Sequence, residues 1–294
     1  MAKIEPEIEA FARIYVVGIG GAGVNAVNHM INSKVRGVEF MVMNTDVQDL
    51  RKSLATKKIH LGKNLTKGLG AGMNPEVGKR AAEETKTEIQ DSIKGSDMVF
   101  IAAGMGGGTG TGAAPIIART AREAGALTVG VVTKPFFFEG TQRMNIALGG
   151  LAELQNEVDA LIVIPNDRLL QIVKKEMTAR AAFSMSDEIL RQAVEGISDL
   201  ITTPGDINVD FADIRAIMAN AGSALMGIGR ASGEKRSEHA ARQAINSPLL
   251  DVSVNGAKGI LFAIAGGEDL GMHEIQEAAK IITESIAPDA KVIF

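Results

Sequence analysis

The stretch Gly106-Gly107-Gly108-Thr109-Gly110-Thr111-Gly112 decides the fold of this 294-residue chain. It lies between an apolar run typical of a buried strand, residues 98–103, and a helical stretch, residues 113–124. Because its side chains are small, its backbone N–H groups are open, and the following helix adds the positive end of its dipole. A flexible loop is the alternative interpretation. The composition and the position between strand and helix favour an anion site for phosphate instead.

A second glycine loop repeats this arrangement nearer the N-terminus. A buried strand at 14–17 is followed by Gly18-Ile19-Gly20-Gly21-Ala22-Gly23-Val24-Asn25, and a helix then continues to about residue 32. Its glycines match G-x-G-x-x-G, which alone is weak evidence for a dinucleotide site. In a parallel sheet both loops lie at the carboxyl edge of the strands, where they can face one ligand. Neither loop contains the lysine of an ordinary P-loop.

Length and composition narrow the class of protein. The chain suits one large domain or two modest ones, and 46% hydrophobic residues are enough for a core. A net charge of −4 argues against a surface for nucleic acid or for direct binding to anionic membranes. The lack of cysteine excludes disulfides and thiolate metal sites and agrees with a reducing cytoplasm. The polar, acidic N-terminus is unlike a signal peptide, and no apolar run reaches the ~20 residues of a membrane helix.

Strand and helix patterns alternate over residues 12–175, which predicts a parallel sheet covered on both faces. We expect strands at 14–17, 38–43, 98–103, 127–132 and 160–164, and helices at 22–32, 75–94, 110–124, 142–156 and 167–175. A long helical pattern follows over about 178–201 and ends at Thr203-Pro204-Gly205. A second α/β unit is expected beyond it, with helices at 210–218, 235–245 and 271–286 and strands at 222–231, 259–266 and 290–294.

Several motifs, in the same order, resemble the tubulin/FtsZ family. The run at 106–112 is similar to the tubulin signature, and further similarities lie at 44–46, 68–72, 135–140, 208–213 and 289–294. The resemblance extends from about Ala12 to the last residue. It implies an α/β protein with a parallel-sheet GTP-binding domain at 1–176, a long connecting helix at 177–203 and a smaller C-terminal activation domain at 204–294. The function implied is a GTPase that polymerises head to tail into filaments of the bacterial division ring.

The resemblance also implies ligands, partners and a location. GTP or GDP is expected with Mg²⁺, and no side chain is assigned as a metal ligand. The expected partners are further copies of the chain, division proteins and membrane-anchoring adaptors, at mid-cell in the cytoplasm. The family continues past Phe294 with further strands, a linker and an adaptor-binding tail, so the second domain is expected to be incomplete. Asp206 stands where the family usually has an apolar residue, and it adds negative charge to the catalytic loop.

The resemblance assigns nucleotide-binding roles to residues in both glycine loops and after neighbouring strands. They are Gly20, Gly21, Ala22, Gly23, Asn25, Asn44, Asp46, Ala71, Gly72, Gly104, Gly106, Gly107, Gly108, Thr109, Gly110, Thr133, Pro135, Glu139, Arg143, Asn166, Phe183 and Asp187. Asn44 and Asp46 are implied to lie near the phosphates or their magnesium. Glu139 and Arg143 are implied to contact the sugar and phosphate side, although their spacing alone is more typical of an exposed helix ion pair.

Asn166, Phe183 and Asp187 lie where the family recognises guanine. A carboxylate can accept hydrogen bonds from the guanine N1–H and the exocyclic amine, a pair of donors that adenine lacks. A phenylalanine offers a stacking face. From the residues alone, Phe183 is more typical of a core and Asp187 of a solvated helix surface.

Asn208, Asp210 and Asp213 are the catalytic residues that the resemblance implies. Asp210 and Asp213 are three residues apart at a helix start, where a cap with dipole compensation is the commoner interpretation. About 20 helical residues at about 1.5 Å each separate this loop from Asp187, a length of roughly 30 Å. Asp210 therefore cannot reach the phosphates of its own subunit. It can reach those of a neighbour, and a head-to-tail contact that does not close builds an open filament.

Two alternatives remain open at this stage. Asp46 follows the second strand, where a Rossmann-type NAD-dependent oxidoreductase has an acid for a ribose hydroxyl. The second glycine loop and the lack of a convincing acid or base for hydride transfer argue against that enzyme. The other alternative is a structural protein that binds GTP without hydrolysing it.

Overall fold

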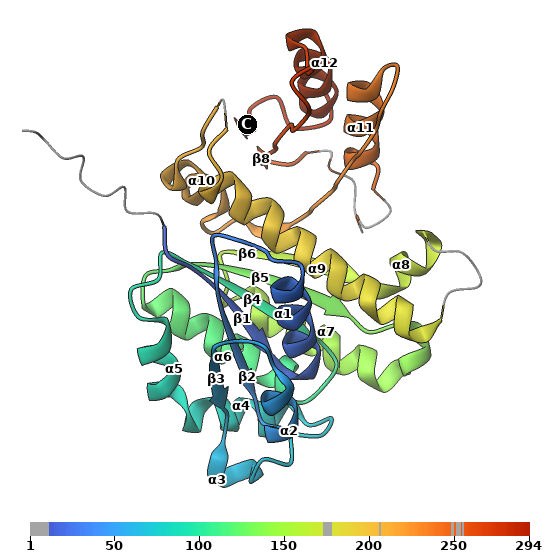
Figure 1. Cartoon of the computed structure of the whole chain (residues 1–294). Helices are drawn as coiled ribbons and strands as arrows, with labels where there is room; N and C mark the ends of the chain where they lie inside the picture. Colours follow the sequence, from blue (N-terminus) through green and yellow to red (C-terminus); the bar gives the residue numbers. More distant parts are fainter. Residues whose placement is uncertain (1–11, 173–177, 206, 248–249, 251–253, 255) are drawn as a thin grey trace, which may run out of the picture.

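The computed structural model describes residues 12–172, 178–205, 207–247, 250, 254 and 256–294 (Figure 1). Seven parallel strands form its large sheet, in the order β3-β2-β1-β4-β5-β6-β7. Their bounds are β1 (Ile14–Ile19), β2 (Glu39–Asn44), β3 (Lys57–His60), β4 (Met98–Gly104), β5 (Leu127–Lys134), β6 (Ala160–Pro165) and β7 (Gly222–Ala224). Strand order reverses between β1 and β4. This is the switch point at which open α/β sheets bind ligands.

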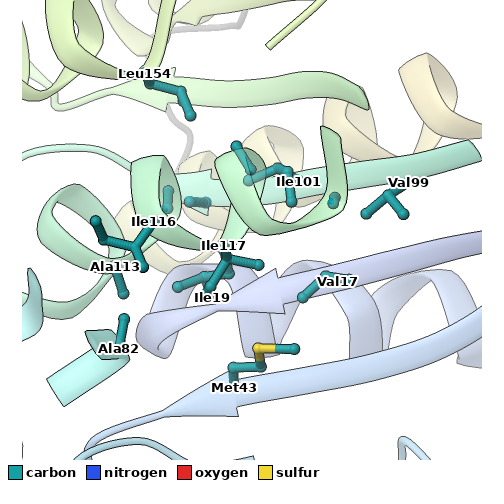
Figure 2. Close-up of a cluster of buried hydrophobic side chains, with 14 of the residues drawn as sticks. Val17, Ile19, Met43, Ala82, Val99, Ile101, Ala113, Ile116, Ile117 and Leu154 are labelled. Carbon is teal, nitrogen blue, oxygen red and sulfur yellow. The ribbon is translucent and has the colours of Figure 1, made fainter. Parts of the chain in front are cut away.

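Helices cover both faces of this sheet (Figure 1). They are α1 (Gly20–Asn32), α2 (Val47–Lys52), α3 (Lys63–Thr66), α4 (Pro75–Glu84), α5 (Lys86–Ile93), α6 (Thr109–Glu123), α7 (Thr141–Gln155), α8 (Asn166–Ile172), α9 (Ala179–Thr202) and α10 (Phe211–Met218), with a 3₁₀ turn η1 (Phe137–Glu139). Side chains of β1 alternate between the two faces. Ile14 and Val16 pack with α1 and α9, whereas Val17 and Ile19 pack with α6 on the other face (Figure 2).

A smaller unit follows, with α11 (Arg236–Ile245), α12 (Met272–Thr283) and a parallel pair of strands, β8 (Gly259–Leu261) and β9 (Lys291–Ile293). It lies beyond α9 at the top of Figure 1. Its buried cluster is small and centres on Ala241, Ala278 and Ile282. Arg236 joins the two helices by ion pairs with Asp269 and Glu274.

Most expected elements are present, and the differences have local causes. The helix expected at 75–94 is two helices, because Thr85 leaves helical geometry at φ −101° and ψ 8° and its hydroxyl donates to the Ala81 carbonyl. The strand expected at 222–231 is only Gly222–Ala224, and it joins β6 in the large sheet. Further along, Gly227 and Gly229 run directly against the backbone of α11. Residues 173–175 of the helix expected at 167–175 lie outside the described residues, as does Asp206.

Candidate nucleotide-binding site

The two glycine loops meet backbone to backbone at the switch point between β1 and β4. Gly20 has a φ of +69°, and a Cβ there would lie 2.9 Å from the Gly110 amide nitrogen. A Cβ at Gly110 would in turn lie 2.7 Å from the Gly104 carbonyl oxygen, and one at Gly104 would lie 2.6 Å from the Ala22 Cβ. No side chain fits at these contacts without displacing backbone or the small Ala22. The glycines are therefore what lets the loops after β1 and β4 share one site.

The helices that leave these loops begin without a side-chain cap. Neither α1 nor α6 has a side chain that accepts a hydrogen bond from its first turn. By contrast, α2, α4 and α9 are capped by Asp46, Asn74 and Thr178. Uncapped first-turn N–H groups and the positive end of the helix dipole bind anions. Two uncapped helix N-termini that meet at one point can together bind several linked phosphate groups.

Hydrogen bonds from the protein fix the shape of the signature loop. The Gly106 amide donates to the Thr111 hydroxyl at 2.8 Å, and the Gly108 amide donates to the Gly72 carbonyl at 2.9 Å. A Cβ at Gly107 would meet no described atom within 4 Å. The loop is thus held on both sides of Gly107, whose own Cα faces open space. The role of Thr111 leaves no signal in the sequence, because its partner is a backbone amide of the same loop.

The loop after β2 lies beside the signature loop and pairs with residues 68–72. The Val47 amide donates to the Gly68 carbonyl and the Gly70 amide donates to the Thr45 carbonyl, both at 3.2 Å. Asp46 caps α2 by accepting from the Gln48 amide at 2.8 Å, so its carboxylate has a structural partner. Asn44 is buried, and its Nδ2 has no hydrogen-bond partner among the described residues. Ala71 also packs here, since a Cβ at Gly108 would lie 3.0 Å from its Cβ.

Glu139 and Arg143 form the ion pair expected from their spacing, and they abut the signature loop. Glu139 also accepts a hydrogen bond from the Phe136 amide at 2.9 Å, which fixes the turn η1. A Cβ at Gly106 would lie 2.9 Å from the Arg143 carbonyl and 3.4 Å from Pro135 Cγ. The pair therefore belongs to the wall of the site and is more than an isolated helix contact.

Asn166 and Phe183 stand together where α8 and α9 begin. The Asn166 Oδ1 accepts from the Ser186 hydroxyl at 2.9 Å, and Asn166 is buried. Phe183 is 45% exposed, so the interpretation of this side chain as core is wrong. Its ring meets Phe136 edge-on at 5.4 Å. This perpendicular contact orients the Phe183 ring, whose exposed part is accessible for stacking.

Asp187 lies one helical turn after Phe183 and is half-buried, so the interpretation as a solvated residue is also wrong. Burial raises the pKa of its carboxyl from 3.8 to about 6, against a smaller opposing effect of His29 on α1. The adjacent Glu188 is instead held charged, because hydrogen bonds from Arg191 and His29 lower its pKa to about 2. Asp187 is thus a half-buried acid without a comparable set of donors. Perturbed carboxyls of this kind mark functional sites.

The acidic segment at 208–213 lies at the opposite edge of the sheet. Asn208 accepts from the Gly205 amide at 2.7 Å. Asp210 precedes α10 but makes no side-chain capping bond, so the interpretation as a helix cap is wrong for this residue. Asp213 lies in the first turn, and both acids are exposed. Within the described part of the chain, neither carboxylate has an ion pair or a hydrogen bond.

Contacts of α9 and α10 place this segment. Arg215 of α10 donates to the carbonyls of Asp97, which directly precedes β4, and of Gly125, two residues before β5. Thr202, the last residue of α9, packs on Gly37 just before β2. All of these contacts are at the amino edge of the sheet, whereas the glycine loops are at the carboxyl edge. At about 3.3 Å per residue, the seven residues of β4 put about 23 Å between the two edges.

The described residues contain no cluster of metal ligands and no membrane-spanning helix. Among the residues described, no group of three or more His, Cys, Asp or Glu side chains could hold a metal ion. None of the described helices is both long enough and apolar enough to span a bilayer.

Comparison with known proteins agrees with this geometry. Residues 13–174 match the model of the Tubulin/FtsZ family GTPase domain, and residues 222–294 match the FtsZ family C-terminal domain. An empty FtsZ dimer from M. jannaschii is 48% identical, with a TM-score of 0.91 over 96% of this chain and 82% of that one. A W319Y variant of M. jannaschii FtsZ is 47% identical, with a TM-score of 0.92 over 97% and 86%. GDP-bound CetZ1 from Haloferax volcanii, 23% identical, shares the fold with a TM-score of 0.81 over 96% and 88%.

Fold, glycine loops and comparisons together define a tubulin-like GTPase that binds guanine nucleotides. The chain belongs to the tubulin/FtsZ family.

Proposed function

We propose that this chain hydrolyses GTP at a site that two copies complete together, and that head-to-tail stacking builds filaments of a bacterial division ring. The observation that carries the proposal is the position of Asp210 and Asp213. They are exposed, unpaired within the described chain, and at the sheet edge opposite the glycine loops. A carboxylate at one edge of the sheet cannot act within the same subunit on a nucleotide bound at the other edge, about 23 Å away. The next subunit can bring its own acids to that site.

In this proposal one subunit binds the nucleotide through two ends of its pocket. Backbone N–H groups of the two glycine loops hold the phosphates, and Glu139 and Arg143 face the sugar and phosphates. Asp187 accepts hydrogen bonds from the guanine edge, Phe183 stacks on the base, and Asn166 closes that end. The residues assigned to the phosphates and the sugar, together with Asn166, belong to the proposed nucleotide-binding domain over residues 1–176, whereas Phe183 and Asp187 lie on α9. The helix over 177–203 connects this domain to the activating part over 204–294.

The neighbouring subunit supplies the chemistry of hydrolysis. Its Asp210 and Asp213 would orient the attacking water and accept its proton, while Asn208 holds the loop through the Gly205 amide. Water adds to the γ-phosphorus, the bond to the β-γ bridging oxygen breaks, and GDP and phosphate leave. Backbone N–H groups of the signature loop meet the charge on the transferred group. A magnesium ion bound with the nucleotide would neutralise part of that charge.

The division of one site between two surfaces makes the contact heterologous. Such contacts either close a ring or continue as an open filament. A filament that hydrolyses GTP at each contact suits a cytoplasmic, mid-cell ring that renews itself. The rival NAD-dependent oxidoreductase is not favoured, because the family matches are to a GTPase domain.

Two variants separate the halves of the site. Asp213→Ala removes an exposed acid and leaves the pocket intact, so it should bind GTP normally and hydrolyse it poorly. Gly107→Val adds a side chain where no described atom lies within 4 Å, so the fold should tolerate it while the phosphates lose their space. Isothermal titration measures GTP binding by each protein, and phosphate release measures turnover alone and in an equimolar mixture.

Hydrolysis should return in the mixture, because an Asp213→Ala pocket can meet the intact acids of a Gly107→Val subunit. Wild-type turnover by Asp213→Ala alone would show that this acid has no catalytic role. A mixture that stays inactive, although both proteins are folded and co-assemble, would contradict the shared site.

A further inference from the structure

Arg215 connects α10, the helix that follows Asp210 and contains Asp213, to the seven-stranded sheet. Its Nη2 donates to the Asp97 carbonyl at 3.2 Å and to the Gly125 carbonyl at 3.1 Å. Its guanidinium also lies 5.4 Å from the centre of the Phe211 ring, at the start of the same helix. The Asp97 carbonyl is itself fixed, since it accepts from the Leu127 amide at 2.9 Å. Arg215 thus holds α10 against two rigid backbone positions.

One of these positions is the far end of the helix that begins at the signature loop. Gly125 follows the C-cap of α6, and its amide closes the helix by donating to the Arg122 carbonyl at 3.0 Å. A cation at a helix C-terminus is favoured by the negative end of the helix dipole. The fifteen residues of α6 span about 22 Å from the phosphate loop to Arg215. A single rigid helix therefore joins the phosphate loop to the contact that holds the acids.

The Arg215 contact also fixes the direction in which the acids point. In an α-helix successive residues turn by about 100°, so Arg215 and Asp213 lie about 200° apart around α10. Because Arg215 faces the sheet edge, Asp213 faces away from the subunit. Asp210 is the N-cap residue of α10, with an extended backbone, and its side chain is exposed like that of Asp213. Ile214 and Met218, both buried, hold the helix to the core, while Ala212 and Asp213 in its first turn are exposed.

We propose that Arg215 is a positioning residue that fixes α10 to the end of α6 and so aims Asp210 and Asp213 at the nucleotide of the neighbouring subunit. This inference rests on the shared site proposed above. It assigns Arg215 no contact with nucleotide. Loss of the contact should therefore reduce turnover and leave GTP affinity unchanged, because misplacement of a catalytic group by about 1 Å can cost up to about a hundredfold in rate.

The variant Arg215→Met keeps an apolar stem over Phe211 and removes both hydrogen bonds. We expect kcat for GTP hydrolysis to fall about tenfold, with the Kd for GTP within about twofold of wild type. Arg215→Lys keeps a cation near the end of α6 and should be intermediate, since a single ammonium cannot reproduce the planar fork of arginine. Arg242→Met is the matched control: Arg242 is an exposed arginine of α11 that pairs with Glu238, and its loss should change neither quantity.

Mixtures then show on which side of the contact Arg215 acts. In the mixture of Asp213→Ala and Gly107→Val, the second protein supplies the acids. Adding Arg215→Met to Gly107→Val should lower the restored rate about tenfold, because that subunit aims the acids. Adding it to Asp213→Ala should leave the restored rate unchanged, because that subunit supplies only the pocket. Thermal unfolding of each variant establishes that the proteins compared are folded.

The outcomes distinguish the two proposals. If Asp213→Ala hydrolyses GTP at the wild-type rate, the shared site is wrong and the role of Arg215 is wrong with it. If Asp213→Ala is inactive but both Arg215 variants hydrolyse GTP normally, only the role of Arg215 is overturned. The role of Arg215 would also be overturned if Arg215→Met lowered the restored hydrolysis rate equally in either protein of the mixture. Weaker GTP binding by folded Arg215→Met would overturn it as well.

Discussion

Thr45 and Thr109 share a buried hydrogen bond, with their Oγ1 atoms 2.6 Å apart. The contact joins the loop after β2 to the first residue of α6, across the switch point of the sheet. It therefore ties together two strand ends that the sequence separates by 64 residues. Both side chains are buried, so removing one hydroxyl leaves the other without this partner.

This relationship predicts a strongly non-additive pair of substitutions. Thr45→Val or Thr109→Val alone leaves one buried hydroxyl without a partner and should lower the free energy of unfolding by about 1–3 kcal/mol. The double variant removes both hydroxyls at similar volume, and should cost less than the sum of the two single variants. Urea unfolding of all four proteins measures the cycle. Additive losses would mean that the two hydroxyls do not depend on each other.

Gly78 of α4 predicts a loss of nucleotide affinity from a residue outside the pocket. A Cβ at Gly78 would lie 2.3 Å from the Gly108 carbonyl, so Gly78→Ala must push α4 and the signature loop apart. We expect GDP affinity to fall by about tenfold or more, equivalent to about 1.4 kcal/mol. Isothermal titration measures this at a temperature at which the protein is fully folded.

Gly149→Ala is the matched control, because Gly149 is also helical and a Cβ there meets nothing within 4 Å. That change should leave GDP affinity unaltered and raise the free energy of unfolding by up to about 1 kcal/mol. Normal GDP binding by Gly78→Ala would show that the loop does not depend on its contact with α4.

Asp187 predicts that guanine binding depends on pH. Burial raises the pKa of its carboxyl to about 6 in the free protein, and only the ionised form accepts both hydrogen bonds from guanine. GDP affinity should therefore be constant above about pH 7 and fall by up to about tenfold per unit below pH 6. Titrations from pH 5 to 8 test this, with Asp187→Asn as the control that should bind weakly and without this dependence. Constant affinity of the wild type down to pH 5 would remove Asp187 from the base site.

The raised pKa of Asp187 also affects the stability of the folded protein, which it lowers at neutral pH. A carboxyl whose folded pKa is above its unfolded value binds protons more tightly in the folded state, so its ionisation destabilises the fold. This cost develops as the pH rises from about 4 to about 6 and persists above it. Asp187→Asn should thus raise the free energy of unfolding at pH 8, by up to about 3 kcal/mol, while it weakens GDP binding. A variant that loses both stability and affinity would show that the charged carboxylate has a structural partner.

The sheet could be predicted because its strands carry their signal in their own residues. The apolar strands at 14–19 and 98–104 are long, buried and followed by glycine, which leaves little ambiguity. The edge strand Lys57–His60 has one apolar residue in four, so no pattern reveals it. Likewise, α2 and α3 are too short for a helical period to emerge. The Thr85 hydroxyl at the helix break also accepts a hydrogen bond from the Gly62 amide, a partner that is distant in sequence.

The glycine loops of the site could be predicted in the same way, since a strand, a glycine run and a helix follow one another in sequence. The environment of single side chains could not. Phe183 is 45% exposed and packs perpendicular to Phe136, and Asp210 makes no side-chain capping bond to α10. The hydrogen bond from Arg215 to the Gly125 carbonyl joins residues 90 positions apart. Contacts of that range follow from the fold and not from local pattern.

The measurement that tests the shared site most directly is GTP turnover per subunit across a dilution series, from well above to well below the concentration at which the chain assembles. If the acids come from a neighbour, the specific activity must fall towards zero as subunits separate, while GTP binding by the separated subunits persists. Specific activity that stays constant down to monomer concentrations would place the complete catalytic site within one chain and contradict the account.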